Sequence, residues 1–160
     1  MKKSLLFFLM ILVMIIHGKY IFANDTNPHS IVEEQQEERI IVENLFKERA
    51  KLWNDLYSQD KNLEELKNQL RDIIAEPLLT FDLEVFESLE KYPSDFDKIN
   101  SLEIMKLGNI TYGQKTMSAD VTILWNMKGL KDDYLEQIQY RVVLLKDKGI
   151  WKLSDYNILQ

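Results

Sequence analysis

The chain of 160 residues contains no cysteine, five glycines and two histidines. Without cysteine it can form no disulfide, no thiolate metal site and no cysteine nucleophile, and it lacks the attachment point of a bacterial lipoprotein anchor. Both histidines, His17 and His29, precede Ser30, so we expect no histidine metal site, triad or general base in the folded part. The glycines are scattered, which argues against a glycine-rich phosphate loop. These absences predict a protein with no cofactor, no bound metal and no catalytic residues.

The N-terminus has the pattern of an export signal. Lys2 and Lys3 precede an uncharged apolar run over residues 4–16, which is shorter than the roughly 20 residues of a spanning helix but fits a secretory signal peptide. A signal peptide over residues 1–23 would end at Ala23, and the mature chain would begin near Asn24. The alternative is an uncleaved anchor over residues 5–23. In both cases the sequence predicts that the rest of the chain is exported, either secreted or held at the membrane by its N-terminal segment.

Charge limits the partners of the exported part. Removing residues 1–23 leaves 17 basic and 26 acidic residues, a formal charge of −9. A chain this acidic repels phosphate backbones and anionic lipid surfaces, so we expect no nucleic-acid partner and no membrane contact beyond the N-terminal segment. A protein partner would complement this charge best with a basic surface.

The first half of the exported part has helical patterns. Residues 24–38 are polar and are interpreted as a linker that grades into a helix, with Ser30 and Glu33 as a candidate capping box. Residues 39–57 and 63–76 repeat apolar side chains every three or four positions, and Pro77 is expected to end the second helix. A third helix is predicted over residues 82–91 with Asp82 as its cap; residues 78–81 could instead form a brief strand.

After Pro93 the apolar period changes to two. Alternation predicts strands over residues 102–112, with an interruption near Gly108, and over 117–127, 136–145 and 150–156. Trp151 and Leu153 are the expected core-facing pair of the last strand. The whole pattern predicts an α+β fold in which N-terminal helices pack on a curved four-stranded antiparallel meander, as a single domain over residues 39–160.

The last two strands suggest a family. The stretch VLLKDKGIWKLSD resembles the closing hairpin of nuclear transport factor 2-like domains, in the cystatin-like superfamily, and the element order over residues 39–159 is similar. The resemblance implies a cone-like fold. It also implies a range of functions: small isomerases and dehydratases, ligand-binding cups, and exported interaction modules. One departure is that members commonly have a strand between the second and third helices, which only residues 78–81 could supply here.

Four aromatic residues could meet between helix and sheet, where they would either fill the core or bind a small apolar ligand: Trp53, Tyr57, Trp125 and Trp151. Asp120 is the acid nearest a strand centre, but its alternation with Val121 turns it toward solvent, away from any cup. We therefore expect a non-enzymatic protein-interaction domain at the bacterial cell envelope, as an assembly subunit or an inhibitor-type binder. The alternative is a carrier or sensor of a small apolar molecule, and an isomerase-like enzyme is a third hypothesis.

Overall fold

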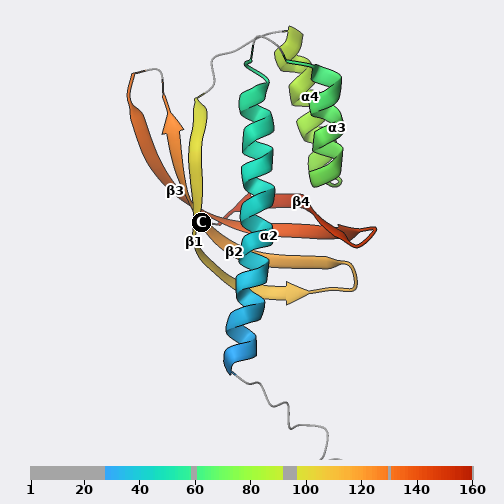
Figure 1. Cartoon of the computed structure of the whole chain (residues 1–160), viewed down its shortest axis with the longest axis vertical. Helices are drawn as coiled ribbons and strands as arrows, with labels where there is room; N and C mark the ends of the chain where they lie inside the picture. The colour runs from blue at the N-terminus through green and yellow to red at the C-terminus, as the bar shows by residue number, and fades with distance from the viewer. Residues whose placement is uncertain (1–27, 59–60, 92–96, 130, 160) are drawn as a thin grey trace, which may run out of the picture. The chain divides into compact units, whose positions relative to one another are not determined.

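Three helices pack against a four-stranded antiparallel sheet in an α+β fold (Figure 1). The computed structural model describes residues 28–58, 61–91, 97–129 and 131–159, and side chains from Gln35 onward. The helices are α2 (Pro28–Asp55), α3 (Leu63–Ile73) and α4 (Leu78–Lys91). The strands are β1 (Lys98–Tyr112), β2 (Thr116–Lys128), β3 (Asp133–Asp147) and β4 (Ile150–Ile158), which pair in chain order. The predicted fold class is confirmed.

Helix α2 begins earlier than its apolar period indicates. The helix starts at Pro28, so residues 28–38 of the predicted linker are helical and residues 24–27 lie outside the described residues. A proline suits the first turn of a helix because it has no N–H to leave unpaired. From Gln35 onward, where side chains are described, the first buried residues of the helix are Glu38 and Val42, which agrees with the late start of the apolar period. Residues 35–160 cluster as one compact unit.

Helix α3 ends before the predicted position. The side chain of Asn62 caps its start by accepting a hydrogen bond from the Glu65 N–H at 3.2 Å. The helix stops at Ile73, and Ile74 is extended and forms a parallel bridge with Leu153 of β4. The prediction that Pro77 ends this helix is therefore wrong, because contact with the sheet takes the backbone of residues 74–75 out of the helix.

Helix α4 includes the segment that the sequence left open. Residues 78–81 are its first turn and not a strand. Asp82 is consequently inside the helix and fully buried, so its predicted role as a cap is wrong.

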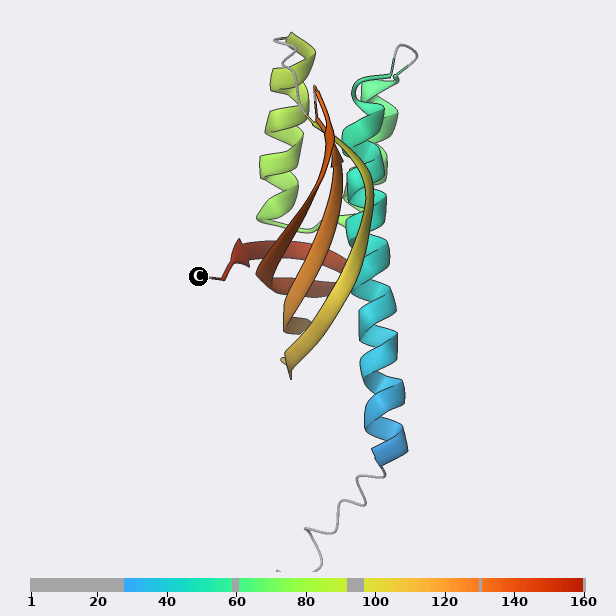
Figure 2. The same cartoon turned by 90° about the vertical axis from the view of Figure 1, so that its left-hand side faces the viewer.

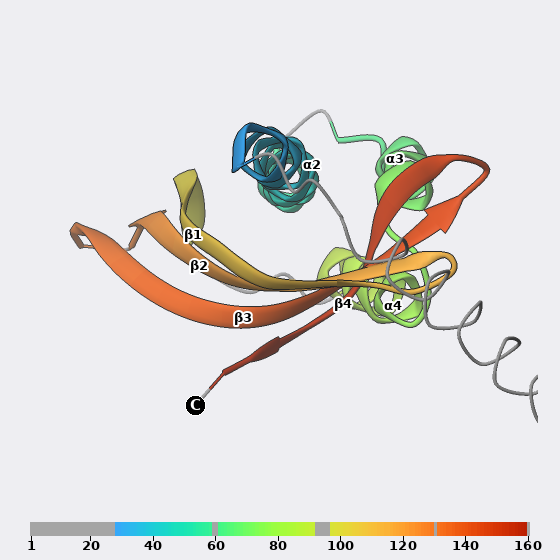
Figure 3. The ribbon, with the colours of Figure 1, turned by 90° about the horizontal axis from the view of Figure 1, so that it is seen from below.

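The sheet curves around α2, as the view from below shows (Figure 3), and the quarter-turned view shows its strands crossing the helix obliquely (Figure 2). β2 matches the predicted alternation closely: Met117, Ala119, Val121 and Ile123 are all at most 1% exposed. They lie opposite Leu144, Val142, Tyr140 and Ile138 of β3, so one face of this strand pair forms the floor of the core. In β4, Leu153 is buried as predicted, whereas Trp151 is only partly buried.

The predicted interruption of β1 is present. The pairing of β1 with β2 shifts register between Gly108 and Thr111, and Asn109 has a positive φ of 50°. Asparagine tolerates this left-handed conformation better than most residues. The bulge places the Asn109 amide 2.6 Å from a carboxylate oxygen of Asp120 on β2.

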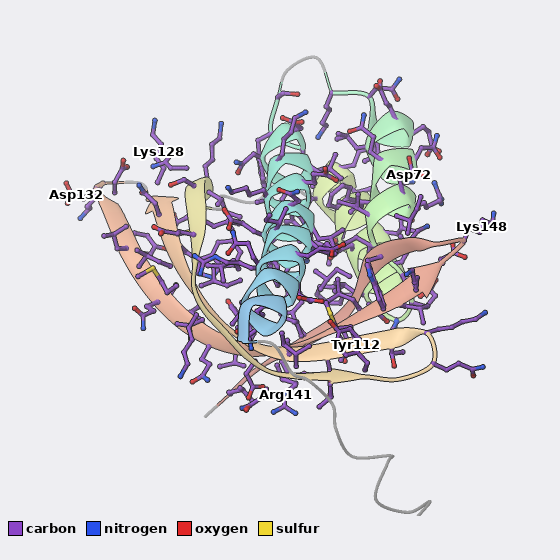
Figure 4. All side chains as sticks on the ribbon, turned by 60° about the horizontal axis from the view of Figure 1, so that its bottom comes forward. Asp72, Tyr112, Lys128, Asp132, Arg141 and Lys148 are labelled. Carbon is purple, nitrogen blue, oxygen red and sulfur yellow. The ribbon has the colours of Figure 1, made fainter. Side chains whose placement is uncertain are left out.

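Asp120 lies on the outer face of the sheet, as predicted, but it is not free in solvent. Its side chain is 10% exposed because Arg141 of β3 covers it in an ion pair, and Asn109 donates to its second oxygen. Arg141 itself projects from the outer side of the sheet (Figure 4). The Arg141 guanidinium, followed by the Asn109 amide, holds the pKa of Asp120 below its ordinary value. Asp120 of β2 therefore links all three of strands β1, β2 and β3 through its side chain.

Acid should weaken this link. Because the pKa of Asp120 is lower in the folded chain than the value of about 3.9 expected when unfolded, its ionised form contributes stability at neutral pH that is lost as pH falls through the folded-state pKa. We expect Asp120→Asn to destabilise the protein clearly at pH 7 and much less at about pH 2.5. Urea unfolding of both proteins at the two pH values tests this; an equal difference at both would contradict it.

Both outer strands of the sheet are partly covered. The Asn54 amide of α2 pairs with the main chain of Ile99 in β1, donating to its carbonyl at 2.8 Å and accepting from its N–H at 3.1 Å. Arg39 donates to the carbonyl of Ile104 in the same strand. At the opposite edge, the Ala75 N–H donates to the Leu153 carbonyl of β4 at 2.9 Å.

No helix in the described part of the chain combines the length and apolar character needed to cross a membrane. The predicted signal peptide over residues 1–23, and the alternative anchor over residues 5–23, lie outside the described residues.

Candidate functional site

An open cleft of about 270 Å³ lies where five elements meet. The C-terminal part of α2, the first turns of α4, and the ends of β1, β2 and β4 each contribute to its wall. Its lining side chains are Arg49, Trp53, Asn54, Tyr57, Phe81, Asp97, Ile99, Met127 and Tyr156. Three further clefts in the described part of the chain are lined mainly by charged and polar residues. We call the first one the aromatic cleft.

The base of the aromatic cleft holds a buried ion pair. The Arg49 guanidinium of α2 donates from Nε and Nη2 to the two carboxylate oxygens of Asp82, at 2.8 and 2.7 Å. The side chains of Arg49 and Asp82 are 12% and 0% exposed. Burial opposes the charge on Arg49, but the hydrogen bond to Asp82 and the neighbouring Tyr156 outweigh it and raise the arginine pKa. Arg49 is therefore held in its charged form, and the two hydrogen bonds to one carboxylate fix the orientation of its guanidinium.

Aromatic rings enclose this guanidinium. It lies 5.2 Å from the ring centre of Trp53 and 5.4 Å from that of Tyr156, within the range of cation–π contacts. Trp53 in turn meets Phe86 of α4 edge to face, with centroids 5.5 Å apart. The ring of Phe81 stands at the rim and is 56% exposed. The cleft thus presents rigid aromatic surface to solvent over a neutralised charge pair.

A second acid lies at the mouth of the cleft. Asp97, just before β1, accepts a hydrogen bond from the Tyr134 hydroxyl at 2.8 Å, and this bond raises the pKa of Tyr134. Within the described residues, Asp97 makes no ion pair.

The four predicted aromatic residues do not all converge. Trp53 and Tyr57 line the aromatic cleft together. Trp125 packs instead in the core, edge to face with Phe46 at 6.1 Å and Tyr140 at 6.5 Å. Trp151 lies in the β3–β4 hairpin under the ammonium of Lys146, 5.1 Å from its ring centre. The prediction of one joint cluster is therefore wrong.

Aromatic side chains fill the centre of the space between α2 and the sheet, whereas the clefts toward its edges are open. Phe46 of α2, 1% exposed, meets Trp125, Tyr140 and Tyr156 with centroids 5.6–6.3 Å apart. Burial raises the pKa of Tyr140, while the adjacent indole N–H of Trp125 opposes this shift. Among the described residues, no three histidine, aspartate or glutamate side chains gather as a metal-binding group.

Sequence reasoning missed most of the cleft. It did not single out Arg49, Phe81 or Tyr156, and it assigned Asp82 to a helix end. One signal was available: Arg49 and Trp53 are four residues apart on a helix and so share a face. The contacts with α4 and β4 join residues too distant in sequence for any such spacing rule.

Comparison with known proteins shows the fold alone. No protein-family model matches the chain, and no curated protein matches it. Among solved structures, it is similar to the intermembrane-space region of the chloroplast protein ARC6, with a TM-score of 0.50 and 12% identity over 76% of this chain and 95% of that one. A protein of unknown function from Bacteroides thetaiotaomicron has a TM-score of 0.40 and 14% identity, over 82% and 96% of the two chains. A designed β-sheet protein has a TM-score of 0.36 and 15% identity, over 78% and 89%.

These likenesses do not identify a family. The resemblance to nuclear transport factor 2-like domains therefore stays a prediction, whereas the arrangement of three helices on an open antiparallel sheet is shown.

Proposed function

We propose that this chain is an exported interaction domain that binds another protein through the aromatic cleft and has no catalytic activity of its own. The packed centre of the space between α2 and the sheet carries this proposal. A carrier of a small apolar molecule needs an enclosed cavity, but here Phe46, Trp125 and Tyr140 occupy the place where one would lie. Apolar surface remains accessible in the open cleft and on scattered side chains.

The size and lining of the cleft favour a protein side chain as its occupant. Small-molecule sites commonly measure about 300–1,000 Å³ and bury most of their ligand, whereas this cleft is open and about 270 Å³. Residues that dominate protein–protein binding are enriched in Trp, Tyr and Arg. Trp53, Tyr57 and Tyr156 line the cleft beside Arg49, so its composition suits a contact of this kind.

Location and charge support the same proposal. The structurally similar region of ARC6 lies in an intermembrane space, a setting comparable with the cell-envelope location that the N-terminal segment predicts here. The formal charge of −9 after residue 23 favours a partner with a basic surface, and binding would then weaken as salt screens the charges.

Site-specific crosslinking tests the proposal. We would place a photoreactive benzoylphenylalanine at Phe81 in the native host, identify the protein it captures and purify that protein. It should bind the wild-type domain, and Phe81→Ala should weaken binding about tenfold, as expected when an exposed aromatic ring becomes buried in the contact. Binding should also weaken between low and high salt. The matched control carries the photoreactive group at Ile150, which is 63% exposed and lies in the β3–β4 hairpin.

Two results would overturn the proposal. One is capture of the same proteins from positions 81 and 150, with no purified candidate binding the domain. The other is a small apolar molecule that copurifies with the domain and is lost in Phe81→Ala, which would favour the carrier.

A further inference from the structure

We infer that the aromatic cleft receives an arginine side chain of the partner, between its aromatic wall and the carboxylate of Asp97. This inference rests on the proposed function and adds the chemistry of the group that is bound. The argument uses the charge balance of the cleft, the behaviour of its own arginine and its size.

The charge balance leaves one acid available. Arg49 and Asp82 neutralise each other through two hydrogen bonds at the base of the cleft. Asp97 at the mouth is exposed, and among the described residues its only polar side-chain partner is the Tyr134 hydroxyl. A carboxylate has about four acceptor positions, so Asp97 keeps room for a donor from outside. Arg49, Asp82 and Asp97 together therefore have a net formal charge of about −1.

Two aromatic rings of the cleft already contact one guanidinium, that of Arg49. Arg49 lies 5.2 Å from the centre of Trp53 and 5.4 Å from that of Tyr156. Trp and Tyr attract cations through their ring faces, and arginine makes this contact more often than lysine because its planar group stacks and is weakly hydrated. Trp53 and Tyr156 are only partly buried, and the exposed ring of Phe81 adds a further wall. A second guanidinium can thus meet aromatic surface on one side and Asp97 on the other.

The volume fits one side chain. A cleft of about 270 Å³ lies just below the range for small-molecule sites. A long side chain can lay its methylene groups along the apolar wall formed by Ile99 and Met127 while its charged end stays near water. An acidic group would be repelled by Asp97, and a purely apolar group would leave the remaining acceptor positions of Asp97 without a donor from the partner.

Nuclear magnetic resonance of the isotope-labelled domain tests the inference with a defined probe. The probe is the blocked tripeptide acetyl-Gly-Arg-Gly-amide, and the comparison peptide carries citrulline, which has nearly the same shape without the charge. We expect the arginine peptide to shift the Trp53 indole and Ile99 amide signals in a saturable way with a millimolar dissociation constant. The citrulline peptide should bind at least about threefold more weakly, as the loss of an exposed charge contact predicts.

A matched pair of variants locates the charge. Asp97→Asn should weaken binding of the arginine peptide by about three- to fivefold. Asp72→Asn makes the same change on α3. Asp72 does not line the aromatic cleft and lies far from Lys128 and Asp132 of the β2–β3 hairpin (Figure 4), so this variant should leave binding unchanged. Both positions are exposed, so neither variant should fail to fold.

Three results would overturn the inference: no saturable shift at Trp53, equal binding of the citrulline peptide, or equal effects of the two aspartate substitutions. If these occur while the crosslink from position 81 and its purified partner stand, protein binding is upheld and only the arginine is wrong. If the peptide result holds but no partner protein is found, the cleft recognises arginine outside a protein interface.

Discussion

Replacing Asp82 with Ala is expected to lower the free energy of unfolding by about 3–5 kcal/mol, because it leaves a buried guanidinium without its counter-ion. Both oxygens of Asp82 are bound by Arg49, and Asp82 is inaccessible to solvent. The guanidinium would then have to draw water into the base of the cleft or move out of it. Urea unfolding at pH 7 measures the loss.

Two control variants test whether the loss of stability comes from unpairing Arg49 and not merely from removing an acidic side chain. Asp72→Ala on the exposed face of α3 should change stability by no more than about 0.5 kcal/mol. The double substitution Arg49→Met with Asp82→Leu should recover most of the loss, because a hydrophobic pair of similar size avoids burying two charges. A loss in Asp82→Ala no larger than that in Asp72→Ala would show that Arg49 is hydrated in the folded protein.

Phe46→Ala should cost a similar amount, about 3–5 kcal/mol, through the cavity it leaves in the core. Phe46 is 1% exposed and meets three aromatic rings, those of Trp125, Tyr140 and Tyr156. These rings come from three different strands, so none can move into the gap without disturbing the sheet. Thermal or urea unfolding would measure the change.

Trp151→Ala provides the contrast. The sequence indicates that Trp125 and Trp151 both belong to the core, with the same cost of about 3–5 kcal/mol for replacing either one by Ala. Trp151 is instead partly exposed under Lys146, so solvent can enter the space left by its removal, and we expect a smaller loss than for Phe46→Ala. Equal losses would contradict this account of the core.

The sheet was largely predictable because its signal is local. In β2, alternation of apolar and polar residues is set by the burial of one face, and the prediction over 117–127 differs from the observed strand by one residue at each end. The helix boundaries were harder to predict from the sequence. Residues 28–38 are helical without an apolar stripe to reveal it, and the mainly apolar segment 78–81 fits a helix or a strand equally well.

The candidate site was predictable only in part, because its chemistry depends on contacts between distant segments. Trp53 and Tyr57 were identified from their helical spacing. Asp82 was assigned to a helix end because aspartate favours that position, and nothing local reveals its partner 33 residues away. A buried ion pair across two helices is visible only once the helices are placed.

The side chain of Asn54 has a consequence for solubility. The outermost strand of an open sheet has unpaired main-chain groups that can recruit a strand from another molecule, the first step toward fibrils. Asn54 occupies this position at Ile99 with the same donor and acceptor that a neighbouring strand would offer, and the Ala75 N–H occupies the Leu153 carbonyl on the far edge. A second molecule must displace these groups before it can lengthen the sheet there. We therefore expect Asn54 to oppose aggregation, a role that a measurement of folding stability would not reveal.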